Sequence, residues 1–250
     1  EKWLRIHDRQ EWPYYYDESN TEELRRFFDY YLLDIDNGWT DTSTVRYSLL
    51  DFQGGNQTDI ASKTFPPIAS QNKRYYLNGK FRSLEEIPLS EDTPVQYAVS
   101  NLPGRSSFQM TFLEETHFVG YPKAKLFMEV DGYDDMDVFV WVQKLDKFGN
   151  VLSEFVVPNQ GAALQDFTQE GASALRYKGA WGRLRASKRL LDKQVATDEI
   201  PAYRFDSVEK LKKGQIVELD IVLSPIGLSY KSGETLRVVI STKDELGSVM

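Results

Sequence analysis

The two histidines are the side chains in this sequence best suited to proton transfer near neutral pH, and no cysteine accompanies them. The lack of cysteine excludes disulfides, thiol catalysis and cysteine-ligated zinc. His7 directly follows KWLRI (2–6), a short segment with the composition of a strand, and a loop then leads to a helix that begins near residue 21. A single histidine is most often structural or exposed, so the setting of His7 has to decide its role.

The order strand, histidine, loop and helix is the order in which an α/β-hydrolase carries its catalytic base, after the serine and the acid of its triad. This order makes His7 the candidate catalytic residue. The nucleophile motif G-x-S-x-G is absent, and the nearest segments, 104–107 and 171–173, lack its second glycine and its strand-to-helix setting. We therefore expect the serine and the acid of such a triad to lie upstream of this chain.

The other candidate sites are better explained as structure. His117, in THFVG, has no carboxylate motif around it and is expected to be structural. The acidic run DGYDDMD (131–137) would suit calcium, but its spacing does not match an EF-hand, so it predicts a solvated turn. No H-E-x-x-H motif is present, and neither a metal nor a cofactor is predicted. The basic segment 179–191 is expected to be a loop whose arginines pair with carboxylates, because the net charge of −8 disfavours an anionic ligand.

One helix and a series of short strands are expected. In SNTEELRRFFDYYLLDI, Asn20 is the predicted N-cap and Asn37-Gly38 the predicted end. Apolar residues recur there at helical spacing, namely Leu24, Phe27, Phe28, Tyr31 and Leu32. After residue 44, branched and aromatic runs predict strands at 45–52, 74–78, 95–100, 107–113, 124–130, 137–145, 151–157, 215–224 and 234–242.

This pattern predicts a mainly β chain: a sandwich or jelly roll of about two hundred residues that follows a helical piece of about forty. KFGN (147–150) predicts a hairpin turn. The segment 158–213 shows little strand character and is too long for an ordinary connection. The helical piece cannot bury its own apolar stripe, so it must pack on the β domain or on a part that is missing.

Composition narrows the possible partners and locations. A net charge of −8 and a pI near 5.0 argue against nucleic-acid binding. No apolar run is long enough to span a bilayer, and EKWLRIHDRQ shows no signal-peptide core. The lack of cysteine favours a cytoplasmic location, although many secreted bacterial proteins share it and secretion stays open.

The ordered set WLRIH…EWPYYY, LRRFFDYYL, DNGW and VRYSLLD resembles the C-terminal part of the CocE/NonD hydrolases, which include cocaine-esterase-like enzymes and X-Pro dipeptidyl-peptidases. In that family a catalytic histidine follows a short strand, and a helix with an FFD signature comes about twenty residues later. Here Phe27-Phe28-Asp29 stands at that spacing from His7. The segments 118–152, 182–189, 211–227 and 232–241 resemble the family's C-terminal β domain, so the resemblance covers nearly the whole chain.

The resemblance implies that residues 1–44 end an α/β-hydrolase domain and that residues 45–250 form a galactose-binding-like jelly roll. It implies a serine hydrolase that cleaves esters or amides, X-Pro dipeptides included, in which His7 takes the serine proton and returns it to the leaving group. The chain alone would be inactive. The implied partners are a small ester or dipeptidyl substrate, the missing N-terminal α/β-hydrolase domain and a second copy of the chain. Packing at the junction of the two parts, rather than catalysis, is expected of Trp12, Tyr14, Tyr15 and Phe27.

Two other interpretations stay open. The chain could be a non-enzymatic β-sandwich that binds carbohydrate or a protein partner, which exposed aromatic residues in a groove would support. It could also be a free-standing hydrolase with a triad built from local serine and aspartate residues, which the missing nucleophile motif disfavours.

Overall fold

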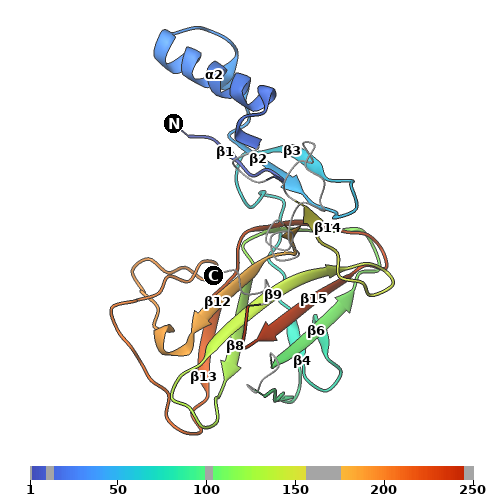
Figure 1. Ribbon diagram of the computed structural model, residues 1–250, viewed down its shortest axis with the longest axis vertical. Helices are drawn as coiled ribbons and strands as arrows, with labels where there is room; N and C mark the ends of the chain where they lie inside the picture. The colour runs from blue at the N-terminus through green and yellow to red at the C-terminus, as the bar shows by residue number, and fades with distance from the viewer. Residues whose placement is uncertain (1, 10–13, 99–103, 156–175, 245–250) are drawn as a thin grey trace, which may run out of the picture. The chain divides into compact units, whose positions relative to one another are not determined.

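The computed structural model describes residues 2–9, 14–98, 104–155 and 176–244 (Figure 1). Contacts group the chain into two compact units, residues 1–70 with 153–177 and residues 71–152 with 178–248. The predicted domain boundary at residue 44 stays a prediction, and the first strands after it group with the helix in this contact pattern. No helix within the described ranges is long and apolar enough to cross a lipid bilayer.

The first unit combines one long helix with short strands. Its three-stranded sheet has the order β1-β2-β3, with β1 parallel to β2 and β3 antiparallel to it. A separate antiparallel pair, β10-β11, completes the unit. The elements are β1 (Leu4–Arg5), α2 (Glu18–Leu33), η1 (Trp39–Asp41), β2 (Val45–Leu49), β3 (Gln57–Ser62), β10 (Glu154–Phe155) and β11 (Arg176–Tyr177).

Helix α2 both starts and ends earlier than the sequence predicts. It begins after Asp17 instead of Asn20, and the Asn20 side chain hydrogen-bonds with Arg5 and with the Tyr14 carbonyl instead of capping the helix. It ends at Leu33 instead of Gly38, because Asp34 adopts the left-handed conformation (φ 52°) that aspartate tolerates. No residue of α2 is fully buried among the described residues.

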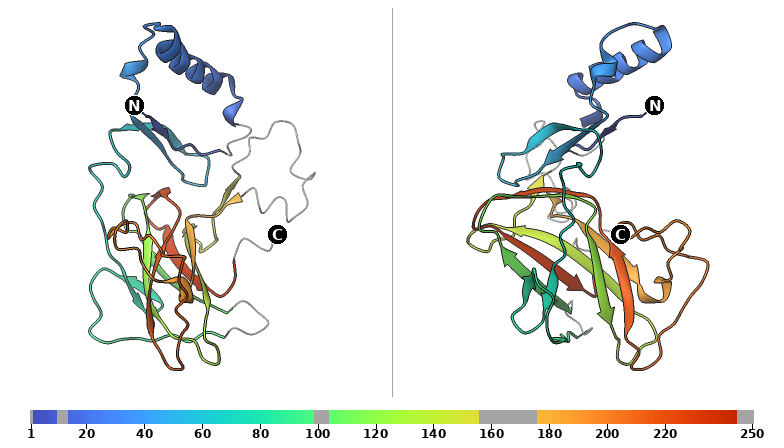
Figure 2. Two further views of the ribbon diagram at one scale, coloured as in Figure 1. Left: turned by 90° about the vertical axis from the view of Figure 1, so that its left-hand side faces the viewer. Right: turned by 180° about the vertical axis from the view of Figure 1, so that it is seen from behind.

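The second unit is the predicted β-sandwich, and the mainly β jelly-roll fold is confirmed (Figure 2). Its large sheet has the order β12-β9-β15-β6-β5-β4, and the pairs β13-β8 and β14-β7 accompany it. The strands are β4 (Tyr76–Asn78), β5 (Ser83–Glu85), β6 (Arg105–Thr111), β7 (Thr116–Gly120), β8 (Lys123–Met128), β9 (Asp137–Leu145), β12 (Trp181–Arg185), β13 (Val217–Val222), β14 (Ile226–Tyr230) and β15 (Thr235–Ser241); η3 covers Ala186–Lys188.

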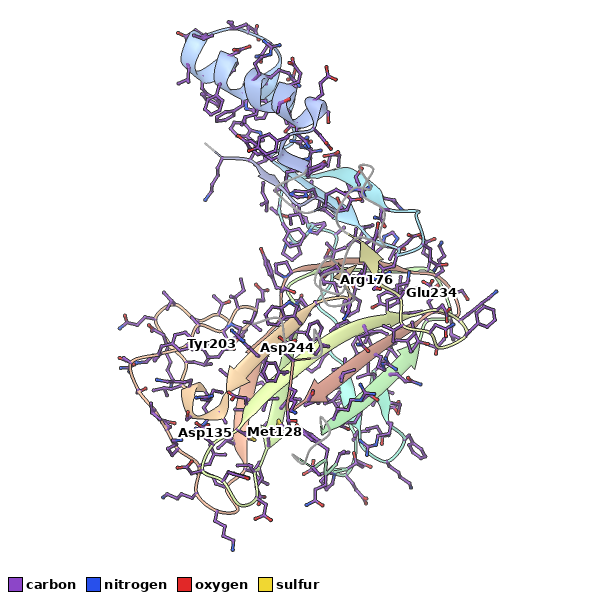
Figure 3. All side chains as sticks on the ribbon, viewed as in Figure 1. Met128, Asp135, Arg176, Tyr203, Glu234 and Asp244 are labelled. Carbon is purple, nitrogen blue, oxygen red and sulfur yellow. The ribbon has the colours of Figure 1, made fainter. Side chains whose placement is uncertain are left out.

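Strand β9 lies at the centre of the sandwich core. Val140, Val142 and Lys144 share one face of β9, and none exposes more than 5% of its surface. The Lys144 Nζ lies 2.7 Å from Glu234 Oε2 and donates to the Ser229 carbonyl at 2.7 Å (Glu234 is labelled in Figure 3). Since Ser229 belongs to β14, this bond places β14 against the inner face of the large sheet. The buried charge is thus both paired and hydrogen-bonded, as a fully buried lysine requires.

Several strands are predicted well from their branched, aromatic and apolar composition. Strands β6, β8, β9 and β15 fall within or close to their predicted ranges, and Asp146 N–H donates to the Asn150 carbonyl at 2.9 Å in the predicted hairpin turn. Residues 95–98 form no strand, so the prediction for 95–100 is wrong over its described part.

Strand β12 lies inside the segment 158–213, where little strand character was predicted. Gly182 interrupts the apolar pattern there, and the structure shows why glycine occupies the position. A Cβ on Gly182 would lie 2.1 Å from the Val222 carbonyl oxygen, so β12 can reach the end of β13 only with glycine at that point. Residues 158–175 of the same segment lie outside the described residues.

Candidate functional site

His7 is the first side chain beyond the short segment that pairs with β2. Leu4 lies beside Val45 in parallel register, and Ile6 continues this pairing by donating its N–H to the Arg46 carbonyl at 2.8 Å. The Ile6 carbonyl in turn accepts from Ser48 Oγ at 3.0 Å. The backbone that carries His7 is therefore fixed to strand β2 up to the preceding residue. His7 is half-buried, and it occupies the position just after the carboxyl end of a parallel strand.

The imidazole of His7 is held by a ring and by a backbone group. The Tyr14 ring stacks on it with centroids 4.4 Å apart and an interplanar angle of 27°. The Arg9 N–H approaches Nδ1 at 3.3 Å. A neutral imidazole that accepts at Nδ1 carries its proton on Nε2. A triad base needs the opposite tautomer, so the long contact with Arg9 has to open before His7 could accept a serine proton.

Two arginines join the sheet of the first unit to helix α2. Arg5 and Arg46 are neighbours across the β1–β2 pair, and Glu23 of the helix accepts hydrogen bonds from both. Asp59 of β3 lies 2.8 Å from Arg5 and 3.6 Å from Arg46. The hydrogen bond from Arg46 lowers the pKa of Glu23 against the opposing effect of burial, so the carboxylate stays charged at neutral pH. This network fixes the helix to the strand that leads to His7.

A buried acidic group lies next to His7 in the sequence. Asp8 is buried, and its Oδ2 accepts from Asn56 Nδ2 at 3.2 Å. The same Asn56 nitrogen lies 2.8 and 2.9 Å from the two carboxylate oxygens of Glu154, on β10. Burial raises the pKa of Glu154, and the Asp8 charge adds to this while the bond from Asn56 opposes it. One amide thus ties the turn after β1 to strand β10 of the same unit.

Two of the aromatic residues expected to pack at the junction, Phe27 and Tyr14, pack against other residues of 1–44. Phe27 lies in a cluster with Trp3, at a centroid distance of 6.1 Å, and with Trp39, at 5.2 Å. Tyr14 packs on His7, whereas Tyr15 exposes 55% of its surface. Packing at the junction stays a prediction for both residues. Trp12 lies outside the described residues.

The remaining candidates behave as structural groups. His117, on β7, is exposed and lies 3.3 Å from Glu115. Ser106, of the segment 104–107, belongs to strand β6 and accepts a hydrogen bond from Arg82, so it is not placed on a nucleophile turn. The segment 171–173 lies outside the described residues.

The acidic run and the basic segment pair with each other, as predicted, but the prediction of a loop is wrong for residues 181–185, which form strand β12. Arg185 donates to Asp137 at 2.8 Å, and Ser187 donates to Asp135 through both its N–H and its Oγ (Asp135 is labelled in Figure 3). Burial opposes ionisation of Asp135, but the bonds from Ser187 and Lys210 outweigh it and lower the pKa. Within the described ranges, no group of three or more His, Asp or Glu residues could hold a metal ion.

The comparisons with known proteins agree with this architecture. The family described as the X-Pro dipeptidyl-peptidase C-terminal non-catalytic domain matches residues 37–250. This chain belongs to that family. No curated protein matches it significantly. A solved CocE/NonD family hydrolase from Staphylococcus aureus is 30% identical, with a TM-score of 0.85, over 100% of this chain and 43% of that one.

A more distant structure shares the fold alone. An α-amino acid ester hydrolase matches 89% of this chain and 37% of its own, with 16% identity and a TM-score of 0.57. The chain therefore spans less than half the length of the solved relatives that it matches. Over that span it corresponds to the C-terminal portion of a CocE/NonD hydrolase. His7 lies outside the stretch matched as non-catalytic, which begins at residue 37.

Proposed function

We propose that this chain is part of a serine hydrolase that cleaves ester or amide acyl bonds, with small esters or X-Pro dipeptides as substrates and His7 as its general base. The observation that carries the proposal is the position of His7 at the carboxyl end of a strand that pairs in parallel, ahead of helix α2. The 30% identity to a CocE/NonD hydrolase along the whole chain supports it. The serine and the acid would come from the proposed α/β-hydrolase domain, outside residues 1–250.

In the proposed reaction His7 moves one proton twice. Its Nε2 takes the proton of the serine hydroxyl as the serine oxygen attacks the acyl carbon, and it then gives that proton to the leaving alcohol or amine. Water repeats the sequence on the acyl-enzyme, releasing the acid and restoring the serine. For this role Nδ1 must donate to the acid of the triad, and that donation would replace the 3.3 Å contact from Arg9.

A network of charged side chains would hold His7 in place for its role as general base. It consists of Arg5, Arg46, Glu23 and Asp59. It ties β1 to helix α2 and to β3 by charge-assisted bonds, and a catalytic base has to be held within a fraction of an ångström. The sandwich, matched as non-catalytic, would contribute by supporting the hydrolase domain and its cleft, not by supplying reacting groups.

The test is His7→Ala in the intact protein, with His117→Ala as the matched control. We expect His7→Ala to lower kcat for p-nitrophenyl esters or an X-Pro amide by about 10³-fold or more, because loss of a triad member has effects of that order. We expect His117→Ala to leave kcat within about twofold, since the His117 ring is exposed on β7 and pairs only locally with Glu115. If the His7→Ala variant hydrolyses these substrates at the wild-type rate, His7 is not the general base.

A further inference from the structure

The ring of His7 is stacked on a side chain that is itself unusually well fixed. The Tyr14 hydroxyl accepts a hydrogen bond from Arg5 Nη2 at 2.5 Å, and the Arg5 guanidinium carbon lies 5.2 Å from the centre of the Tyr14 ring. The Tyr14 carbonyl accepts from Asn20 Nδ2 at 2.6 Å. Both ends of Tyr14, backbone and hydroxyl, are thus tied to neighbouring elements.

The two residues that hold Tyr14 also hold each other. Arg5 Nη1 donates to Asn20 Oδ1 at 2.6 Å, so strand β1, helix α2 and Tyr14 form a closed set of hydrogen bonds. Arg5 is further fixed by Glu23 and Asp59. A displacement of the Tyr14 ring would have to break the charge-assisted bond from Arg5, and such bonds are stronger than neutral ones.

The Tyr14 side chain is better suited to hold the His7 ring in place than to transfer a proton. Burial raises the pKa of Tyr14, and the nearby carboxylates Asp59 and Asp8 add to this while Arg5 opposes it. The phenol therefore stays neutral across the range in which an imidazole titrates. Its hydroxyl is occupied by Arg5, and the part that faces His7 is the flat ring. A neutral aromatic face fixes the plane of the imidazole while leaving its nitrogen edges to other partners.

We propose that Tyr14, held by Arg5 and Asn20, is the positioning residue of His7. This proposal rests on the proposed function, since positioning matters only if His7 transfers a proton. A base displaced by about an ångström loses on the order of 10²-fold in rate although the substrate still binds. The stack between Tyr14 and His7 therefore acts on kcat and not on KM.

The experiment compares Tyr14→Leu and Tyr14→Phe in the intact protein. Tyr14→Leu removes the stacked ring, and we expect kcat to fall about 10–100-fold with KM within about twofold. Tyr14→Phe keeps the ring and loses only the bond from Arg5, so we expect it to restore kcat to within about fivefold of the wild type. Tyr16→Leu is the matched control, because Tyr16 exposes 76% of its surface, and its kcat should not change.

The outcomes separate this proposal from the function on which it rests. If His7→Ala abolishes hydrolysis while Tyr14→Leu keeps wild-type kcat, the positioning role alone is overturned. Activity that is unaffected by His7→Ala, or an intact protein that hydrolyses no acyl substrate, overturns both. A thermal unfolding scan of each variant shows whether it is folded. If kcat falls in Tyr14→Leu and Tyr14→Phe does not restore it, this result also contradicts the proposal.

Discussion

At the scale of single residues, the acidic pair joined by Asn56 makes the stability of the first unit depend on pH. The pKa of Glu154 is raised in the folded chain, so the folded state binds its proton more tightly than the unfolded state does. The stabilisation that this gives is fully present below the unfolded pKa and is lost as the pH rises through the folded pKa. At neutral pH the ionised Glu154 is therefore a net cost, because it is partly desolvated and lies near Asp8.

Glu154→Gln should remove this cost while keeping one oxygen that can accept from Asn56. We expect a rise in Tm of about 1–3 °C at pH 7–8 and no rise below about pH 4, where Glu154 is protonated in both states. Thermal unfolding followed by circular dichroism at several pH values measures this, and Glu91→Gln, at an exposed carboxyl, is the control. An equal shift at pH 4 and pH 8 would show that the charge is not the cause.

His7 could be chosen as the candidate base from sequence, and that role stays a prediction, but its surroundings could not be predicted. The order strand, histidine, loop and helix is a local pattern, and it singles out His7 without any knowledge of contacts. The sequence predicts only packing for Tyr14, because its separation of seven residues from His7 does not specify how the two rings lie. The bonds of Arg5 with Asn20 and Asp59 cross between elements, and only the folded chain specifies them.

At the scale of elements, strands such as β9 and β15 could be predicted because their sequences are short runs rich in branched and apolar residues. Strand β12 could not be predicted, because Gly182 lowers its strand propensity. Glycine is required there because a Cβ would clash with the Val222 carbonyl oxygen. The sequence predicts one apolar face on α2, but in the structure only part of that face is packed. Phe27 packs against Trp3 and Trp39, whereas Leu32 exposes 71% of its surface.

The exposed part of this stripe tests the proposed partner domain. If the hydrolase domain covers the outer face of α2, Leu32→Asp buries a charge there and should cost the intact protein about 2–4 kcal/mol. In the 250-residue chain alone the same change should stay within about 0.5 kcal/mol, since Leu32 is exposed. Urea unfolding of both forms measures the difference, with Ser19→Asp, on the exposed polar side of the helix, as the control. Equal small effects in both forms would mean that nothing covers this face.

At the scale of the whole molecule, the chain holds a candidate base and a large sandwich but lacks a visible nucleophile motif. The sandwich has its own apolar core, in which the buried charges of Lys144 and Glu234 pair with each other. The family match to a non-catalytic domain agrees with this division of labour. The proposed reaction therefore requires groups from two parts of a longer protein.

This division predicts that the 250-residue chain alone does not react with a fluorophosphonate probe, whereas the intact protein takes up one probe per molecule. Phosphonylation needs a serine whose proton a neighbouring base removes, and Ser106, of the described segment nearest to the motif, lies within a strand and is bonded to Arg82. Mass spectrometry of both forms after the same exposure gives the stoichiometry directly. Heat-denatured intact protein controls for unspecific labelling. Stoichiometric labelling of the short chain would instead show that it carries its own nucleophile, and peptide mapping would then name the serine.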